Sequence, residues 1–304
     1  MSRIHEALKK AAQEKSIQLA AGLEAEIGQV AGEIRRSSTW ADVIGEPVAP
    51  SRGNTTGHKP FPLRYEELIK SCAHPEWRPG PLESVFQNPR IGNGVSERFR
   101  TLRSRLFQIA GTRTLRRLLV TSSVAGEGKT FVTSNLAQSI IQQPALRVLL
   151  VDADLRASHL HSTLGAPNCP GLSDYLRGNA DGFEVIQKGM NENLCLIPGG
   201  SRASNPSELL LSERMRNLLD LLTPMFDWVI IDSPPAMPVH DASILAGLTD
   251  GVLLVVQAGS THVGIAEKIA TEFQGKNLLG VVLNQVEKSD SYGDYYYGYH
   301  GNRD

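Results

Sequence analysis

Residues 118–143 contain the pattern most suggestive of chemistry in this chain. A short apolar run leads into Ser-Ser-Val-Ala-Gly-Glu-Gly-Lys-Thr over residues 122–130, and a helix-like segment follows. Glycines in such a loop let successive backbone N–H groups face one anion, and the start of the helix adds positive potential. A following lysine and threonine can contact phosphates and Mg²⁺. The sequence therefore predicts a phosphate-binding P-loop.

The predicted nucleotide contacts are Ala125, Gly126, Glu127, Gly128, Lys129, Thr130, Phe131 and Asn284. Ser123 stands where the pattern G-x-x-x-x-G-K-[ST] has its first glycine, so a glycine-rich turn that only caps a helix is the structural alternative. Asn284 ends an apolar run and could present its amide to the base, or it could only cap a loop. Because no Asn-Lys-x-Asp sequence for reading guanine follows, we expect ATP in preference to GTP.

Carboxylates end two further apolar runs. Asp152 and Asp154 follow residues 149–151, and Asp232 follows residues 229–231. Side chains two apart on an extended segment share a face, so both carboxylates of the first pair could point towards the phosphates. One can accept the proton of an attacking hydroxyl while another holds Mg²⁺. Each segment alone could be a turn or helix cap, but their order after the P-loop favours a nucleotide site.

We predict catalytic roles for Lys129, Asp152, Asp154 and Asp232, and metal ligands at Thr130, Asp152, Asp154 and Asp232. Positioning these groups requires parallel strands that end at one edge of a sheet. Short apolar runs at 118–121, 148–151, 194–197, 229–231, 252–256 and 281–283 alternate with helix-like segments. The expected fold is therefore an α/β P-loop NTPase with a mostly parallel sheet flanked by helices.

Four regions are expected along the 304 residues. They are an amphipathic helical segment at 1–36, a linker or irregular extension at 37–84, the P-loop domain at 85–288 and a flexible tyrosine-rich tail at 289–304. The net charge of −1 gives no general reason to expect a nucleic-acid partner. No run of about 18 apolar residues occurs, so we expect a soluble protein whose membrane attachment would need a partner.

The tail holds five of the seven tyrosines, at Tyr292, Tyr295, Tyr296, Tyr297 and Tyr299. Glycine and aspartate surround these residues, a composition that cannot bury aromatic rings in a core. An accessible segment of this kind suits a phosphoacceptor, and several phosphotyrosines would repel one another and could switch an assembly off. An aromatic tail that only binds a partner is the alternative.

Glu97, Arg100 and Arg103 are spaced three apart within the helical pattern that starts near Val95. This spacing puts them along one face, where they could pair with another subunit. A surface pair between Glu97 and Arg100 is the simpler interpretation of the same spacing.

Taken together, the P-loop, Asp152-x-Asp154-x-Arg156, residues 230–234, Glu97-x-x-Arg100-x-x-Arg103 and the tyrosine tail resemble the bacterial tyrosine kinases over residues 85–304. The resemblance implies autophosphorylation in trans within a ring-shaped oligomer, control of exopolysaccharide or capsule synthesis and export, and Asp152 as the base. It also implies a stand-alone form, cytoplasmic and peripheral at the inner face of the membrane through a separate transmembrane activator of the polysaccharide co-polymerase type. A tyrosine phosphatase is a further expected partner.

Two other classes of protein compete with the kinase. Partitioning or placement ATPases of the deviant Walker A group share the sheet and the aspartates, but they have a second lysine early in the loop, where this chain has Val124. A nucleotide-gated binding module without turnover is the other alternative. Phe99 stands where the kinase family often has tyrosine.

Overall fold

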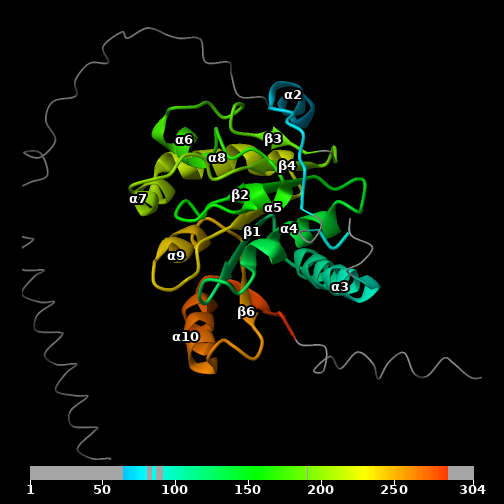
Figure 1. Ribbon diagram of the computed structural model, residues 1–304, viewed down its shortest axis with the longest axis vertical. Coiled ribbons are helices and arrows are strands. Elements are labelled where there is room, and N and C mark those ends of the chain that lie inside the picture. The colour runs from blue at the N-terminus through cyan, green and yellow to red at the C-terminus, as the bar shows by residue number, and fades with distance from the viewer. Residues whose placement is uncertain (1–63, 81–83, 87–91, 190, 287–304) are drawn as a thin grey trace, which may run out of the picture. The chain divides into compact units, whose positions relative to one another are not determined.

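The computed structural model of the protein describes residues 64–80, 84–86, 92–189 and 191–286 (Figure 1). These residues contain a seven-stranded sheet with the strand order β3-β4-β2-β5-β1-β6-β7. The strands are β1 (Arg117–Ser122), β2 (Val148–Asp152), β3 (Gln187–Lys188), β4 (Leu194–Ile197), β5 (Trp228–Asp232), β6 (Gly251–Gln257) and β7 (Leu278–Asn284). Every neighbouring pair is parallel except β3 and β4. The expected α/β P-loop fold with a mostly parallel sheet is confirmed.

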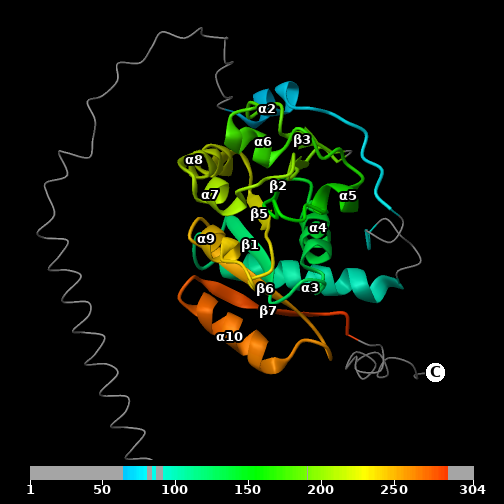
Figure 2. The same ribbon diagram turned by 60° about the vertical axis from the view of Figure 1, so that its left-hand side comes forward.

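Helices cover both faces of this sheet. They are α2 (Tyr65–Ser71), α3 (Gly92–Ala110), α4 (Lys129–Ile140), α5 (Leu160–Leu164), α6 (Leu172–Arg177), α7 (Pro206–Leu211), α8 (Glu213–Leu222), α9 (Asp241–Ala246) and α10 (Val263–Gln274), with a 3₁₀ turn at Thr223–Met225. Figure 2 shows α3, α4 and α5 on one side of the sheet and α7, α8 and α9 on the other. Crossover helices of this kind bury parallel strands on both faces, which explains why the central strands are continuous apolar runs, whereas the edge strand β7 is only partly buried.

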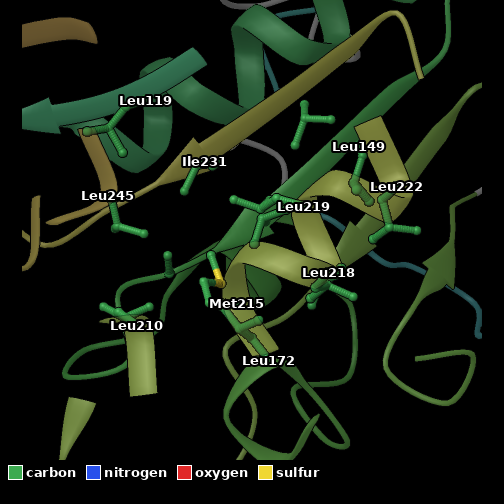
Figure 3. Packing of buried hydrophobic residues seen from close by; sticks show 14 of the residues in the cluster. Leu119, Leu149, Leu172, Leu210, Met215, Leu218, Leu219, Leu222, Ile231 and Leu245 are labelled. Atoms are coloured by element: carbon green, nitrogen blue, oxygen red, sulfur yellow. The ribbon is translucent and has the colours of Figure 1, made fainter. Parts of the chain in front are cut away.

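Alternate residues of each strand enter two separate hydrophobic clusters. On β1, Leu118 and Val120 pack with α3, α4 and α5, whereas Leu119 packs with the helices of the opposite face. Figure 3 shows the cluster that contains Leu119, in which Leu219 of α8 packs with Leu149 and Ile231 of the sheet. All of these side chains are fully buried. The two cores hold the strand ends in a fixed register.

All six apolar runs expected to form strands do so, extended by up to three residues at their ends. The sequence did not indicate β3, which has only two residues and pairs antiparallel with β4 at the edge of the sheet. A segment so short has no periodicity that could be recognised.

The linker expected over residues 37–84 needs correction in its last part. Residues 65–71 form α2, whose Tyr65 and Leu68 lie in one core, and Trp77 lies in the other. The backbone N–H of Ala73 donates to the carbonyl of Ile186 at 3.0 Å. Residues 64–80 therefore pack as part of the α/β unit, because a few large apolar side chains anchor an otherwise polar stretch.

The chain divides into Met1–Gly57, which lies outside the described ranges, and His58–Asp304, which contains every described residue. The predicted amphipathic helix at 1–36 and the tyrosines of residues 289–304 also lie outside them. Within the described ranges, no helix has the length and apolar character that crossing a bilayer requires.

Candidate nucleotide and phosphoryl-transfer site

The P-loop connects the end of β1 to the start of α4. Gly126 and Gly128 have φ angles of 88° and 87°, a left-handed conformation that side chains disfavour. A Cβ atom at Gly128 would also collide with the side-chain amide of Asn284. The sequence needs glycine at both positions for this turn to form. Lys129 and Thr130 are the first residues of α4, whose unpaired N–H groups can face an anion.

Two carboxylates meet because their strands are neighbours in register. Asp152 ends β2, Asp232 ends β5, and the two residues are direct partners in the parallel ladder. Both are completely buried, and Asp154, just beyond β2, is 3% exposed. The carboxyl ends of parallel strands are where α/β folds place their ligands. The fold thus brings all three predicted carboxylates to the edge of the sheet that also holds the P-loop.

Direct contacts join the P-loop to these carboxylates. Lys129 Nζ lies 3.0 Å from Asp154 Oδ2 in a buried ion pair. The Thr130 hydroxyl donates to Asp232 Oδ2 at 2.7 Å, and the Thr133 hydroxyl donates to Asp232 Oδ1 at 3.1 Å. The three separated motifs therefore form one cluster.

Asp152 is held by a separate set of donors. The Ser158 hydroxyl donates to its Oδ2 at 2.7 Å, and the backbone N–H of Leu160 donates to the same atom at 3.0 Å. Gly199 lets Ser158 approach, since a Cβ atom there would lie 2.6 Å from the Ser158 hydroxyl oxygen. Sequence reasoning missed Ser158 because no motif marks it, and it missed Thr133, which lies one turn beyond Lys129 on α4.

Burial and mutual repulsion govern the electrostatics of the cluster. Burial, followed by the negative charge of Asp232, raises the pKa of Asp152 to about 7. Burial likewise raises the pKa of Asp232. Burial alone would lower the pKa of Lys129, but the carboxylates of Asp232, Asp154 and Asp152 outweigh it and raise that pKa. The cluster carries more negative than positive groups, a surplus that a cation would relieve.

The donor atoms suit Mg²⁺, a hard cation that prefers oxygen ligands. Among the described residues, however, no three acidic, histidine or cysteine side chains converge as a ready-made metal site. Mg²⁺ commonly keeps water and binds through one or two carboxylates together with phosphate oxygens. Thr130 and Asp232, which are already in contact, fit that pattern, and their geometry does not require a cage of all four predicted ligands.

The remaining predicted nucleotide contacts differ in exposure, and Glu127 is buried. Ala125 and Gly126 are exposed. Phe131 and Asn284 line a groove of about 420 Å³ between α3 and the end of β7, together with Phe99. The Asn284 amide donates to the carbonyl of Glu127 at 2.9 Å, so Asn284 also supports the loop in this structure.

The predicted subunit contact has partners within its own chain. Glu97 and Arg100 form an ion pair on the surface of α3, with their side chains 56% and 44% exposed. Arg103 Nη1 donates to the carbonyl of Ser139 on α4 at 2.5 Å. Glu97 and Arg100 therefore remain accessible, whereas Arg103 also fastens α3 to α4.

The fold and the P-loop define a nucleotide-binding protein, and residues 117–274 match the family described as AAA domain. The chain is 36% identical to the tyrosine-protein kinase CpsD of Streptococcus agalactiae over 227 residues, which cover 73% of this chain and 97% of that protein. The kinase domain of the Escherichia coli tyrosine kinase ETK is similar, with a TM-score of 0.58 and 33% identity, over 65% of this chain and 80% of that structure.

A cell division ATPase, MinD of Pyrococcus furiosus, is also similar, with a TM-score of 0.50 and 26% identity over 58% of this chain and 74% of that structure. The likeness to the two kinases is higher in sequence identity and in coverage of this chain. The chain belongs to the bacterial tyrosine kinase family, and it is a protein-tyrosine kinase.

Proposed function

We propose that this chain is an ATP- and Mg²⁺-dependent autokinase that transfers the γ-phosphoryl group to its own tyrosine-rich tail, acting in trans between subunits. The observation that supports this most is the direct contact between P-loop side chains and buried carboxylates, Lys129 with Asp154 and Thr130 with Asp232. Three motifs separated by up to 102 residues thereby share one edge of the sheet. Membership of the tyrosine kinase family supports the choice of acceptor.

The proposed roles follow from the position and charge of each group. Lys129 holds the β- and γ-phosphates, for which it must exchange at least part of its contact with Asp154. Thr130, Asp232 and Asp154 would hold Mg²⁺, which would neutralise the charge of the phosphoryl group.

Asp152 is the proposed base. It accepts the proton of the tyrosine hydroxyl as the phenolic oxygen attacks the γ-phosphorus, and the bridging oxygen leaves with ADP. A pKa of about 7 suits a base that works near neutral pH. Ser158 and the backbone of Leu160 fix the orientation of its carboxylate. The groove beside Phe131 and Asn284 is the proposed place for the adenine.

The biological setting is also a proposal that rests on family membership. We infer a ring-shaped homo-oligomer that uses Glu97, Arg100 and Arg103, and we expect it to bind the inner face of the membrane through a transmembrane activator of the polysaccharide co-polymerase type. Phosphorylation of the tail, reversed by a tyrosine phosphatase, would regulate exopolysaccharide or capsule synthesis and export. The exposure of Glu97 and Arg100 supports an interface on α3.

A mixing experiment tests both the reaction and its direction between subunits. One full-length variant carries phenylalanine at the five tail tyrosines and an intact site. The second keeps the tail but carries Asp232→Asn. The two are incubated with Mg²⁺ and ATP labelled at the γ-phosphate, with the activator's cytoplasmic segment added if wild-type labelling is slow, and phosphotyrosine is mapped by mass spectrometry.

Transfer in trans predicts label on the tail of the Asp232→Asn chain only when the other variant is present. Label on wild-type protein but not in the mixture would contradict transfer between subunits. Release of inorganic phosphate without tyrosine labelling would favour the partitioning-type ATPase, although Val124 occupies the position of that group's second lysine. Nucleotide binding with neither product would favour a binding module.

A further inference from the structure

Glu127 is an unusual residue for a loop that binds phosphates. Its side chain is acidic, and the residue is only 1% exposed. Within the described ranges no lysine, arginine or histidine forms an ion pair with it. Burying a carboxylate costs free energy unless hydrogen bonds compensate it, and a negative charge in this loop also opposes a triphosphate. Its presence needs a structural reason.

Neutral donors from two parts of the chain compensate the buried carboxylate. The backbone N–H of Val124 donates to Glu127 Oε2 at 2.9 Å, which closes the loop on itself. The hydroxyl of Thr261 donates to Oε1, and the backbone N–H of Gln257 lies 3.4 Å from the same atom. Gln257 ends β6, and Thr261 lies between β6 and α10. The side chain of Glu127 thus ties the P-loop to the β6–α10 loop.

The main chain of the same loop is held from β7. The carbonyl of Glu127 accepts from the Asn284 amide at 2.9 Å, and the carbonyl of Gly126 accepts from the Gln285 amide at 3.1 Å. A P-loop binds phosphates through its N–H groups, so its carbonyls must point elsewhere. These contacts fix two of those carbonyls. Residues at and just beyond the ends of β6 and β7 therefore form hydrogen bonds that hold the P-loop in a conformation able to bind an anion.

We propose that Glu127 and Thr261 are positioning residues for the triphosphate. Their hydrogen bond, the Glu127–Thr261 latch, holds the P-loop in its phosphate-binding shape before nucleotide arrives. Preorganised donors avoid the cost of ordering the loop at the moment of binding. Neither side chain needs to touch the nucleotide for this role. The inference rests on the proposed binding of ATP at the P-loop and adds residues of the β6–α10 loop to that site.

Thr261→Val tests the latch with a small change, since valine has a similar shape but no hydroxyl. The change leaves the Glu127 carboxylate one donor short. We expect the Kd for Mg²⁺–ATP, measured by calorimetry on the full-length protein, to rise about tenfold, equivalent to about 1.4 kcal/mol. The KM for ATP in tail phosphorylation should rise by a similar factor, with kcat within about twofold, because the loop contacts ground state and transition state alike.

Two further variants separate positioning from general damage. Thr261→Ser restores the hydroxyl and should bring the Kd back to within about twofold of wild type. Thr271→Val removes a threonine hydroxyl from the exposed side of α10, where it donates only to the carbonyl of Glu267, and it should leave the Kd unchanged. If Thr261→Val lowers the melting temperature but not the affinity, the latch only stabilises the fold and the proposal is wrong.

A double-mutant cycle tests whether the two residues act as a pair. Glu127→Gln removes part of the accepting capacity and also the charge that opposes the triphosphate, and we expect the lost positioning to outweigh the lost repulsion, so that the Kd rises about tenfold. If the latch is one interaction, the double variant should bind no more than about twofold more weakly than the weaker single variant. If the two losses of affinity multiply, so that the Kd of the double variant rises about a hundredfold, the two residues do not act as a pair and the latch is refuted.

The cycle also separates this inference from the proposed function. Wild-type protein that fails to bind Mg²⁺–ATP would refute the proposed function itself. Wild-type binding with unchanged affinity in Thr261→Val and Glu127→Gln would refute only the latch.

Discussion

Replacing Lys129 with methionine should destabilise the protein even before any nucleotide is added. The ammonium group lies 3.0 Å from Asp154, and both side chains are largely buried, at 13% and 4% exposure. Asp152 and Asp232 are completely buried close by and contribute to the raised pKa of Lys129. Methionine has a similar length but leaves these carboxylates without the ammonium group that now faces them.

Removing one partner of a buried ion pair typically costs about 3–5 kcal/mol, because the remaining charge is uncompensated. The lower end of that range applies here, since a pKa of about 7 lets Asp152 take up a proton. For a domain of this size, about 3 kcal/mol lowers the melting temperature by roughly 6–12 °C. Lys129→Met should show that loss by circular dichroism at pH 7.5 with EDTA present.

Two companion variants make the result specific. Lys129→Met combined with Asp154→Asn removes both charges of the pair, so it should regain about half of the lost stability. Lys268→Met changes an exposed lysine on α10 and should melt close to wild type. If Lys129→Met itself melts within about 2 °C of wild type, the carboxylates are not held ionised by Lys129 and the electrostatic reasoning is wrong.

Two further predictions concern the surface of α3 and the start of α6. Arg100→Ala with Arg103→Ala should shift the assembly to smaller species by light scattering, whereas an unchanged mass would leave α3 as a surface helix. Asp174→Asn should destabilise the fold by about 1–2 kcal/mol at pH 7, because the carboxylate accepts from the backbone N–H groups of Gly171 and Ser201 at 2.9 and 3.1 Å. Burial alone would raise the pKa of Asp174, but hydrogen bonds from Ser201 and Gly171 outweigh it and hold that pKa below its ordinary value. The stabilisation is therefore complete above pH 5, begins to be lost near pH 4 and disappears as the pH falls through the lowered pKa. Urea unfolding at pH 7 and at about pH 3 should show the stability difference between wild type and Asp174→Asn shrinking at the lower pH.

The sequence predicted the sheet well because buried parallel strands are uninterrupted apolar runs. The same logic placed Asp152 and Asp232 together, since residues that end neighbouring parallel strands must meet. Local signals of this kind depend only on period and order along the chain.

Contacts that depend on three-dimensional packing could not be predicted in this way. Glu127 was expected to contribute as part of the phosphate loop, but its partner Thr261 lies 134 residues away and carries no motif. The contact of Ser158 with Asp152 depends on a close approach by Gly199, which is visible only in the folded chain. The sequence did not predict helix α2, because only two of its large side chains, Tyr65 and Leu68, are buried and they form no recognisable apolar pattern.

The position of β5 has a consequence for the order in which the protein can be made. Although β5 is fifth in the chain, it lies between β1 and β2, so the P-loop and Asp152 have no direct strand pairing with each other. During synthesis, β1 and β2 are made before β5, so the edges that they present to β5 stay unpaired until residues 228–232 leave the ribosome. Competence to bind nucleotide is therefore gained late in translation, after β5 and then β6, the other neighbour of β1, have been made, which lengthens the period in which the nascent chain can pair with the wrong strand.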